Sequence, residues 1–376
     1  MKKQLLCYFF LLSFFQSKAA ETDSTSLSKI SQSKIVKFFT GHKYLVSPFV
    51  FYMPETSWVL GGGVKRFFNG GGEGDSLTRV SNTAIFLQYS LNSQIMFEHN
   101  YQIFTNKEKY YIVGYYGFSR FPVLFYGVGA EAKPENEEAI TFDLIRFDNL
   151  TYRKIANHTF AGLGWRYFKM YNVQGKSNGI LENGNDVVGR KGSTVSGLNV
   201  SVQFDNRDNV LTTSHGSFLQ LEYSAHEHWT GSTQSFHRWQ LDARKFLMPF
   251  AQRKDVLAFQ AFAFLTNGNV PFHELGLLGG DMIMRGYYVG SRRDKDLLAF
   301  QTEYRWQALK RWGLVGFGGL GWVNNKIGDM NMTNILPSYG AGLRFKINRK
   351  ENVNVRVDYG FGNGQQNLYF FIAEAF

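Results

Sequence analysis

The chain has 376 residues, of which 44% are hydrophobic and 17% aromatic, with 39 glycines and only 7 prolines. The hydrophobic content excludes a disordered chain, and the lack of any apolar stretch of about 18 residues excludes a helical membrane protein. The formal net charge is +11, but the basic residues form no stripe on a helix, so no nucleic-acid partner is expected. An aromatic-rich and glycine-rich β protein remains.

The first residues predict a secretory signal peptide. Lys2 and Lys3 precede an apolar stretch from Leu5 to Phe15, and small residues then permit cleavage after Ala19. A buried N-terminal strand is the alternative, but the mostly polar run that follows disfavours it. The predicted organisation is a signal peptide at 1–19, a short periplasmic tail at 20–42 and a β-barrel at 43–376.

Alternating polar and apolar residues predict strands through the rest of the chain. In the stretch Phe236 to Leu247, for example, Arg238, Asp242 and Arg244 fall on one face, while Trp239 and its neighbours at every second position fall on the other. Sixteen segments are expected, at 43–53, 57–68, 81–91, 93–104, 109–120, 138–152, 158–172, 193–205, 217–228, 235–248, 255–267, 297–308, 312–323, 338–348, 353–361 and 367–376.

The same alternation is typical of a soluble β-sandwich and of a membrane barrel whose apolar face meets lipid. The signal peptide, the aromatic residues near segment ends and the final Phe376 favour a barrel in the bacterial outer membrane. The long connections 173–192, 268–296 and 324–337 all follow odd-numbered strands, which makes them extracellular. The connection 69–80 breaks this parity, and 121–137 has room for an extra element.

Five short motifs along the predicted barrel fall into a recognisable order. In chain order they are Tyr52-Met53-Pro54-Glu55-Thr56, Phe204-Asp205-Asn206-Arg207-Asp208 followed by Gly216, Met284-Arg285-Gly286-Tyr287, Thr302-Glu303-Tyr304-Arg305, and Arg356-Val357-Asp358-Tyr359-Gly360. Together they resemble the BamA/TamA family of outer-membrane assembly barrels (the bacterial surface antigen family), in a member that lacks periplasmic POTRA domains. The resemblance covers residues 48 to 376. It implies a transmembrane antiparallel barrel of about 16 strands, with the loop between strands eleven and twelve folded into the lumen.

The loop motif predicts an anchor inside that lumen. Arg285 can form a bidentate, charge-assisted bond to a carboxylate, Gly286 permits close backbone approach, and Tyr287 completes the motif. Alternation places Glu303 on the lumen face of strand twelve. In the resembled family a second acidic residue is expected at the position that Gly319 occupies in this chain. Because glycine has no carboxylate, Glu303 is the expected single partner of Arg285. A solvated loop arginine is the alternative.

Two further candidate sites follow from the pattern. The family-like hairpin consists of Asp205, Arg207, Asp208 and Gly216. A weak lateral seam is expected where the first and last strands meet, because proline and glycine form poor ladders. Its candidate residues are Pro48, Gly362, Gly364 and Phe376. An ordinary closed seam is the alternative.

No catalytic residue, cofactor or metal ligand is expected. His226 and His228 share a strand face, but no third ligand is evident from the sequence. The resemblance implies a role in inserting or translocating outer-membrane components, directly or as an accessory subunit. A passive or plugged channel is the alternative function, and an enzyme is the least favoured one. Outer-membrane lipids are the expected partners, with outer-membrane or periplasmic assembly proteins as further candidates.

Overall fold

The computed structural model describes residues 44–53, 57–71, 78–91, 93–129, 132–184, 187–210, 212–250, 252–348 and 353–376. The predicted signal peptide, the predicted tail and Pro54 to Thr56 of the first motif lie outside the described residues. Among the described helices, none has the length and apolar character needed to cross a membrane.

Strands make up most of the described chain. Their bounds are β1 (Tyr44–Met53), β2 (Ser57–Phe68), β3 (Ser81–Ser90), β4 (Ile95–Phe104), β5 (Tyr110–Phe125), β6 (Glu138–Ala156), β7 (Thr159–Gln174), β8 (Ser193–Asp205), β9 (Gly216–His226), β10 (Phe236–Leu247), β11 (Val256–Gly268), β12 (Gly276–Leu278), β13 (Arg292–Asp294), β14 (Asp296–Trp306), β15 (Trp312–Asn324), β16 (Leu336–Asn348), β17 (Val353–Gly362) and β18 (Gln365–Ile372). The helices are short: η1 (Asn106–Glu108), η3 (Pro134–Asn136), α3 (Ile180–Asn183), η4 (His228–Thr230), η5 (Phe272–Glu274), η6 (Ile327–Asp329) and η7 (Met332–Asn334).

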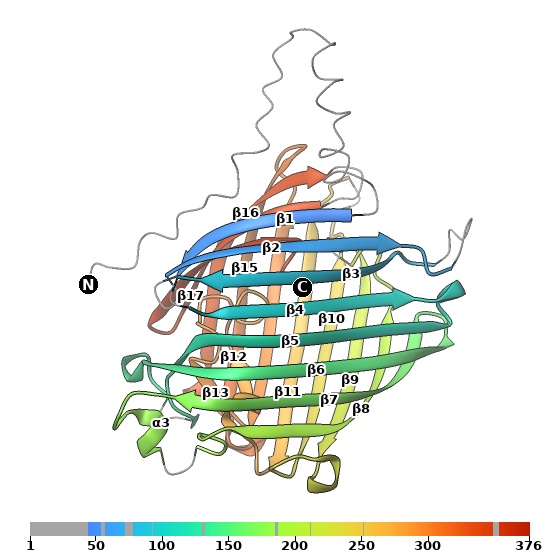
Figure 1. Cartoon of the computed structure of the whole chain (residues 1–376). Coiled ribbons are helices and arrows are strands. Elements are labelled where there is room, and N and C mark those ends of the chain that lie inside the picture. The colour runs from blue at the N-terminus through green and yellow to red at the C-terminus, as the bar shows by residue number, and fades with distance from the viewer. Residues whose placement is uncertain are drawn as a thin grey trace. The chain divides into compact units, whose positions relative to one another are not determined.

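Sixteen of these strands form one sheet in sequence order, with β11 followed directly by β14. The remaining two, β12 and β13, form a separate antiparallel pair. This confirms the predicted all-β class and the expected sixteen strands of the main sheet. Figure 1 shows β2 to β5 following one another across the sheet.

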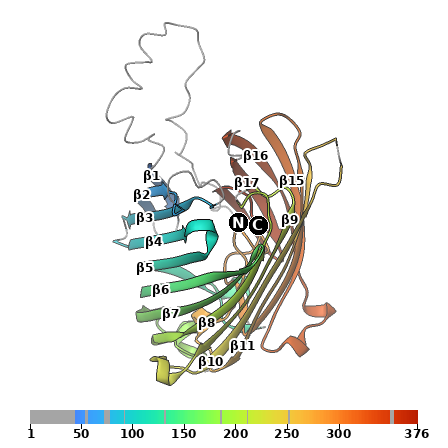
Figure 2. The same cartoon turned by 90° about the vertical axis from the view of Figure 1, so that its right-hand side faces the viewer.

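The chain divides into two compact units. Among the described residues, unit 1 comprises those from Tyr44 to Val123 with Thr141–Lys154 and Gly164–Gln174, and unit 2 comprises those within Leu124–Ile140, Ile155–Leu163 and Gly175–Phe376. Strands β1 to β4 belong wholly to unit 1, and β8 to β18 belong wholly to unit 2. Figure 2 shows the run of strands β8 to β11 in unit 2, whose antiparallel pairs follow chain order.

The strands of unit 2 bury their polar face and expose their apolar face. In β14, Glu303 and Arg305 are 0% and 8% exposed, whereas Phe300 is 51% exposed. In β10, Arg238 is buried and Trp239 is 49% exposed. A soluble sheet would show the reverse, so this arrangement agrees with strands whose outer side contacts lipid.

Several predicted boundaries were wrong, each for a local reason. Strand β5 continues beyond residue 120 because Leu124 and Phe125 are buried, and the connection after it holds η3. The long connection after β11 contains the extra hairpin β12–β13. The last strand ends at Ile372, because Ala373 has a φ of 80° and turns the chain out of the ladder.

Candidate functional site: a loop arginine docked on the polar face

The connection between β11 and β14 lies against the polar face of unit 2. Its central residues include Met284, Arg285 and Tyr287, which are 0 to 1% exposed. Gly286 has a φ of 117°, and a Cβ there would lie 2.3 Å from the main-chain carbon of Phe361. Only glycine therefore allows the loop to pass this close to β17.

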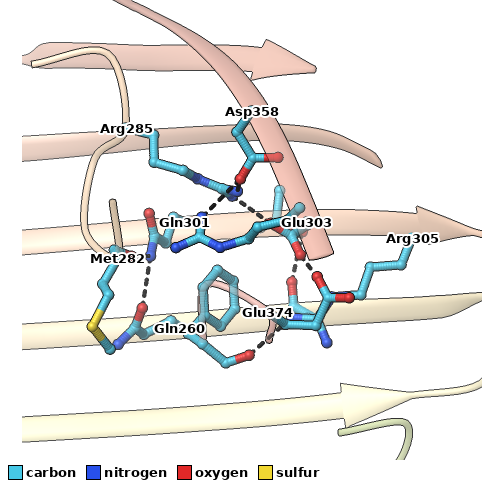
Figure 3. Close-up of polar contacts among 12 residues, drawn as sticks. Gln260, Met282, Arg285, Gln301, Glu303, Arg305, Asp358 and Glu374 are labelled. Atoms are coloured by element: carbon cyan, nitrogen blue, oxygen red, sulfur yellow. Dashed lines mark hydrogen bonds and ion pairs between the residues drawn. The ribbon is translucent and has the colours of Figure 1, made fainter. Parts of the chain in front are cut away.

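Arg285 contacts two carboxylates at once (Figure 3). Its Nη1 donates a hydrogen bond to Oδ2 of Asp358 at 2.6 Å, and its Nη2 donates to Oε2 of Glu303. The guanidinium also lies 3.6 Å from the centroid of the Phe317 ring. Glu303 and Asp358 are both 0% exposed. Because Glu303 belongs to β14, Phe317 to β15 and Asp358 to β17, three strands surround the side chain of Arg285.

Both carboxylates are shared with further arginines. Arg305 Nε donates to Oε1 of Glu303 at 2.6 Å, and Arg344 Nη1 donates to Oδ1 of Asp358. Arg356 Nη1 donates to Oδ2 of Asp358 at 2.8 Å. Because buried charges are tolerated only when they are paired, this arrangement keeps each cation next to an anion.

The network extends to the end of the described chain. Glu374 Oε2 accepts a hydrogen bond from Arg344 Nε at 2.6 Å, and the main-chain oxygen of Phe376 accepts one from Arg305 Nη2 at 2.9 Å. The segment 373–376 is thus linked to Glu303 through Arg305 and to Asp358 through Arg344. The loop contacts the same two carboxylates directly, through Arg285. Figure 3 shows Glu374 and Arg285 near Glu303, in the same cluster.

The residue after the loop glycine is held by neutral hydrogen bonds. Tyr287 OH donates to the carbonyl of Pro337 at 2.8 Å and accepts from the backbone N–H of Asn363 at 2.9 Å. Tyr369 OH accepts from the Gly286 N–H at 2.9 Å. The predicted motif residues Arg285, Gly286 and Tyr287 therefore all contact strands or turns far away in the sequence.

The expectation of a single acidic partner for Arg285 was wrong. Glu303 is one partner and Asp358 is the second, although Asp358 is 73 residues away in the chain. Gly319 cannot supply a carboxylate; instead, a Cβ there would lie 3.0 Å from the sulfur of Met284. The alternation of β17 already placed Arg356 and Asp358 on one polar face, which was the available signal for the missed partner.

The family-like hairpin lies between β8 and β9 and is built from local contacts. Arg207 donates to both carboxylate oxygens of Asp205 at 2.8 and 2.9 Å. Asp208 accepts from the backbone N–H groups of Ser214 and His215 at 2.9 and 3.2 Å. Burial alone would raise the pKa of Asp208, but a hydrogen bond from the Ser214 hydroxyl, together with the two backbone hydrogen bonds, outweighs burial, and the pKa lies below its usual value. A Cβ on Gly216, whose φ is 109°, would lie 2.6 Å from the carbonyl oxygen of Asn206.

The predicted seam residues belong to two different units of the chain. Pro48 in β1 is opposite Gly62 of β2 in unit 1, whereas Gly362 and Gly364 lie at the turn between β17 and β18 in unit 2. Phe376 was expected in the last strand, and this was wrong. It lies beyond β18, is buried, and clusters with buried residues of β10 and β11: Phe246, Val256 and Ala258.

His226 and His228 each have a partner within the protein. His226 Nε2 lies 3.2 Å from the Ser224 hydroxyl, and its ring stacks on Phe236. His228 Nδ1 lies 3.0 Å from the carbonyl oxygen of Ser232. Within the described residues, no group of three metal-ligating side chains occurs.

Comparison with known proteins agrees with this architecture. Residues 76–376 match the Omp85 superfamily domain. The crystal structure of BamA from Haemophilus ducreyi lacking POTRA domains 1–3 is similar, with a TM-score of 0.57 and 12% identity over 88% of this chain and 69% of that one. CdiB from Acinetobacter baumannii is similar with a TM-score of 0.54 and 13% identity, over 88% and 59% of the two chains. CdiB from Escherichia coli gives 0.57 and 12% identity, over 88% and 62%. At this identity the likeness shows the fold alone. No curated protein matches the sequence.

Proposed function

Because the chain belongs to the Omp85 superfamily, we propose that it is an outer-membrane β-barrel that takes part in the insertion or translocation of outer-membrane components. It acts directly or as an accessory subunit of a larger complex. Outer-membrane lipids surround its exposed apolar face, and delivery of clients falls to outer-membrane or periplasmic assembly proteins.

The observation that carries the proposal is the docked loop arginine. A buried ion pair adds little net stability relative to apolar packing, but breaking it leaves an uncompensated charge. Arg285 is therefore better explained by positioning than by stabilisation. It holds the loop in one position against β14 and β17, through its ion pairs with Glu303 and Asp358.

We further propose that the route for clients lies at the ends of the sheet. Pro48 lies within the continuous pairing of β1 with β2 but brings no backbone donor to β1. Gly362 and Gly364 flank the start of β18, where Gly364 has a φ of 74°. These features favour weak pairing along the edge strands, which is what lateral release into lipid requires.

The proposal is tested by depleting the protein in its own cell and measuring the folded amounts of other outer-membrane barrels. Lower amounts are expected, with restoration by the wild-type gene and weaker restoration by Glu303→Gln. Unchanged amounts of every barrel and of every surface-exposed protein would contradict the proposal.

A plugged channel is the second candidate, and the buried loop over the polar face is the observation that favours it. Single-protein conductance in planar bilayers separates the two functions. A large conductance that appears when Arg285 is replaced, together with normal assembly after depletion, would favour the channel.

A further inference from the structure

Two turns at one end of unit 2 carry excess positive charge. Residues 248–255, between β10 and β11, and residues 307–311, between β14 and β15, contain four basic residues and one acidic residue. The basic side chains are exposed: Arg253, Lys254, Lys310 and Arg311. The single carboxylate, Asp255, forms an ion pair with Arg253 at 3.3 Å and also accepts hydrogen bonds from Tyr304 OH at 2.8 Å and from the Gln307 N–H at 3.1 Å. The turns therefore leave most of their positive charge uncompensated.

A cavity of about 1020 Å³ opens between these turns. Its lining also includes Lys346 of β16 and, from the buried polar face, Arg305, Arg344 and the carboxylate of Glu374. The same lining includes Trp306, Leu309 and Leu314, which are 40%, 64% and 41% exposed. Cations next to exposed aromatic and aliphatic side chains are typical of the boundary between headgroups and hydrocarbon.

A groove of about 670 Å³ lies along the same four strands, β10, β11, β14 and β15. Small residues face each other there, with Ala243 opposite Ala261 and Thr302 opposite Gly318. Large exposed side chains border it: Phe259, Phe300 and Leu320. The groove is thus a depression in the apolar face, shaped by a change in side-chain size.

The groove on the apolar face and the exposed cations of the turns lie along the same strands. Gly318 is six residues along β15 from Trp312 at the edge of the turn, which is about 20 Å of extended chain. One leaflet of a bilayer contributes roughly 15 Å of hydrocarbon. Lys245 is exposed, lines the groove and donates to the Ser217 hydroxyl at 3.0 Å.

We propose that this end of unit 2 binds one anionic phospholipid, with its phosphate between the two turns and an acyl chain in the groove. This inference rests on the proposed membrane location. An acidic protein segment would satisfy the cations but would leave the apolar groove unexplained. A zwitterionic lipid brings its own cation to the turns, so it binds more weakly.

The test is native mass spectrometry of the full-length protein in detergent, titrated with phosphatidylglycerol or with phosphatidylcholine. More phosphatidylglycerol adduct is expected at equal concentration. Each cation near an anionic headgroup accounts for about a fivefold change in affinity, so the K310Q/R311Q variant should lose about 25-fold. Gly318→Leu should also weaken binding without changing the charge, because a Cβ there meets only the Ser338 carbonyl oxygen, at 3.7 Å.

The matched control is K191Q/K326Q, which removes two exposed cations at the opposite strand ends and should leave binding unchanged. Equal binding of the two lipids, or equal loss in the control, would overturn the proposal. Preferential binding of lipid A or of an acidic peptide would also overturn it. Membrane fractionation of the cell distinguishes failure of this inference from failure of the proposed membrane location. If the protein is found in the outer membrane but shows no lipid preference, only the lipid-binding inference is contradicted.

Discussion

Arg207 and Arg285 are both buried, and both pair with carboxylates, yet they act over different ranges of the chain. Arg207 pairs with Asp205, only two residues away, and lies 4.5 Å from the centroid of the Phe218 ring. Arg285 pairs with Glu303 and Asp358, which are 18 and 73 residues away. The first arginine fixes the shape of one hairpin, and the second fixes a loop against strands that the chain forms elsewhere.

The sequence separation between each arginine and its carboxylate partners decides which part of the structure depends on that arginine. Losing a local pair loosens a turn whose ends are still held by β8 and β9. Losing the long-range pairs removes two ionic contacts of the loop with the sheet and leaves the ion pair of Asp281 with Arg356, at 2.6 Å, and the neutral hydrogen bonds of Gly286 and Tyr287. The experiments that sharpen this comparison measure the exposure of residues 279–290 or of the hairpin, and they are ordered from the largest expected effect to the smallest.

Arg285→Ala should have the largest effect. Removing one partner of a buried ion pair costs about 3–5 kcal/mol, here because Glu303 and Asp358 would face each other without the guanidinium between them. Subtilisin digestion of the purified protein should then cleave within 279–290. Arg285→Lys should give intermediate protection, because a single ammonium group lacks the planar fork that bridges two carboxylates. Cleavage at the wild-type rate would show that the loop is held by other contacts.

Asp358→Asn and Glu303→Gln should have smaller effects, since each leaves Arg285 one carboxylate. A hydrogen bond to a charged group contributes about 1.5–3 kcal/mol, so partial cleavage is expected in either variant. In a double-mutant cycle with Arg285→Ala, the effects should be non-additive because the residues are in contact. Additive effects would mean that the carboxylates stabilise the fold independently of the loop.

Glu374→Gln tests whether the ionic network couples the segment 373–376 to the loop. Glu374 lies outside the loop and shares Arg344 with Asp358, the partner of Arg285. A coupling of about 0.5–1 kcal/mol is expected for residues in one ionic network, seen as faster hydrogen exchange in residues 279–290. Glu182→Gln, an exposed carboxylate on the short helix α3, is the matched control. Equal exchange in both variants would show that the segment 373–376 and the loop are independent.

Arg207→Ala should leave residues 279–290 unchanged. Hydrogen exchange should increase only in the hairpin 206–215, because its partner Asp205 belongs to the same turn. Faster exchange of the loop in this variant would remove the distinction between the two arginines.

The smallest effect is the pH dependence of the hairpin. Because the pKa of Asp208 is lowered in the folded protein, its contribution is complete above the unfolded-state pKa of about 3.9. It is lost as the pH falls through the folded-state pKa. Asp208→Asn should weaken the protection of the hairpin at neutral pH and flatten its acid dependence. An unchanged profile between pH 2 and 6 would contradict the role of Asp208.

Much of the fold could be predicted from the sequence because alternation is a local signal. The bounds of β2 and β8 agree with the predicted segments, and the same alternation put Glu303 on the buried polar face. Asp358 was missed because its pairing depends on how β17 lies relative to the loop, which no local pattern records. The end of β18 was missed because the turn at Ala373 follows from the contacts of Glu374 and Phe376 with distant arginines.

The central claim, that the loop is docked on the polar face through Arg285, is tested most directly by hydrogen exchange of the wild-type protein in a lipid environment. The backbone amides of residues 279–290 should exchange slowly, at rates close to those of β14 and β15. Exchange as fast as that of the exposed turn at 325–334 would contradict the docked loop and the positioning role of its arginine.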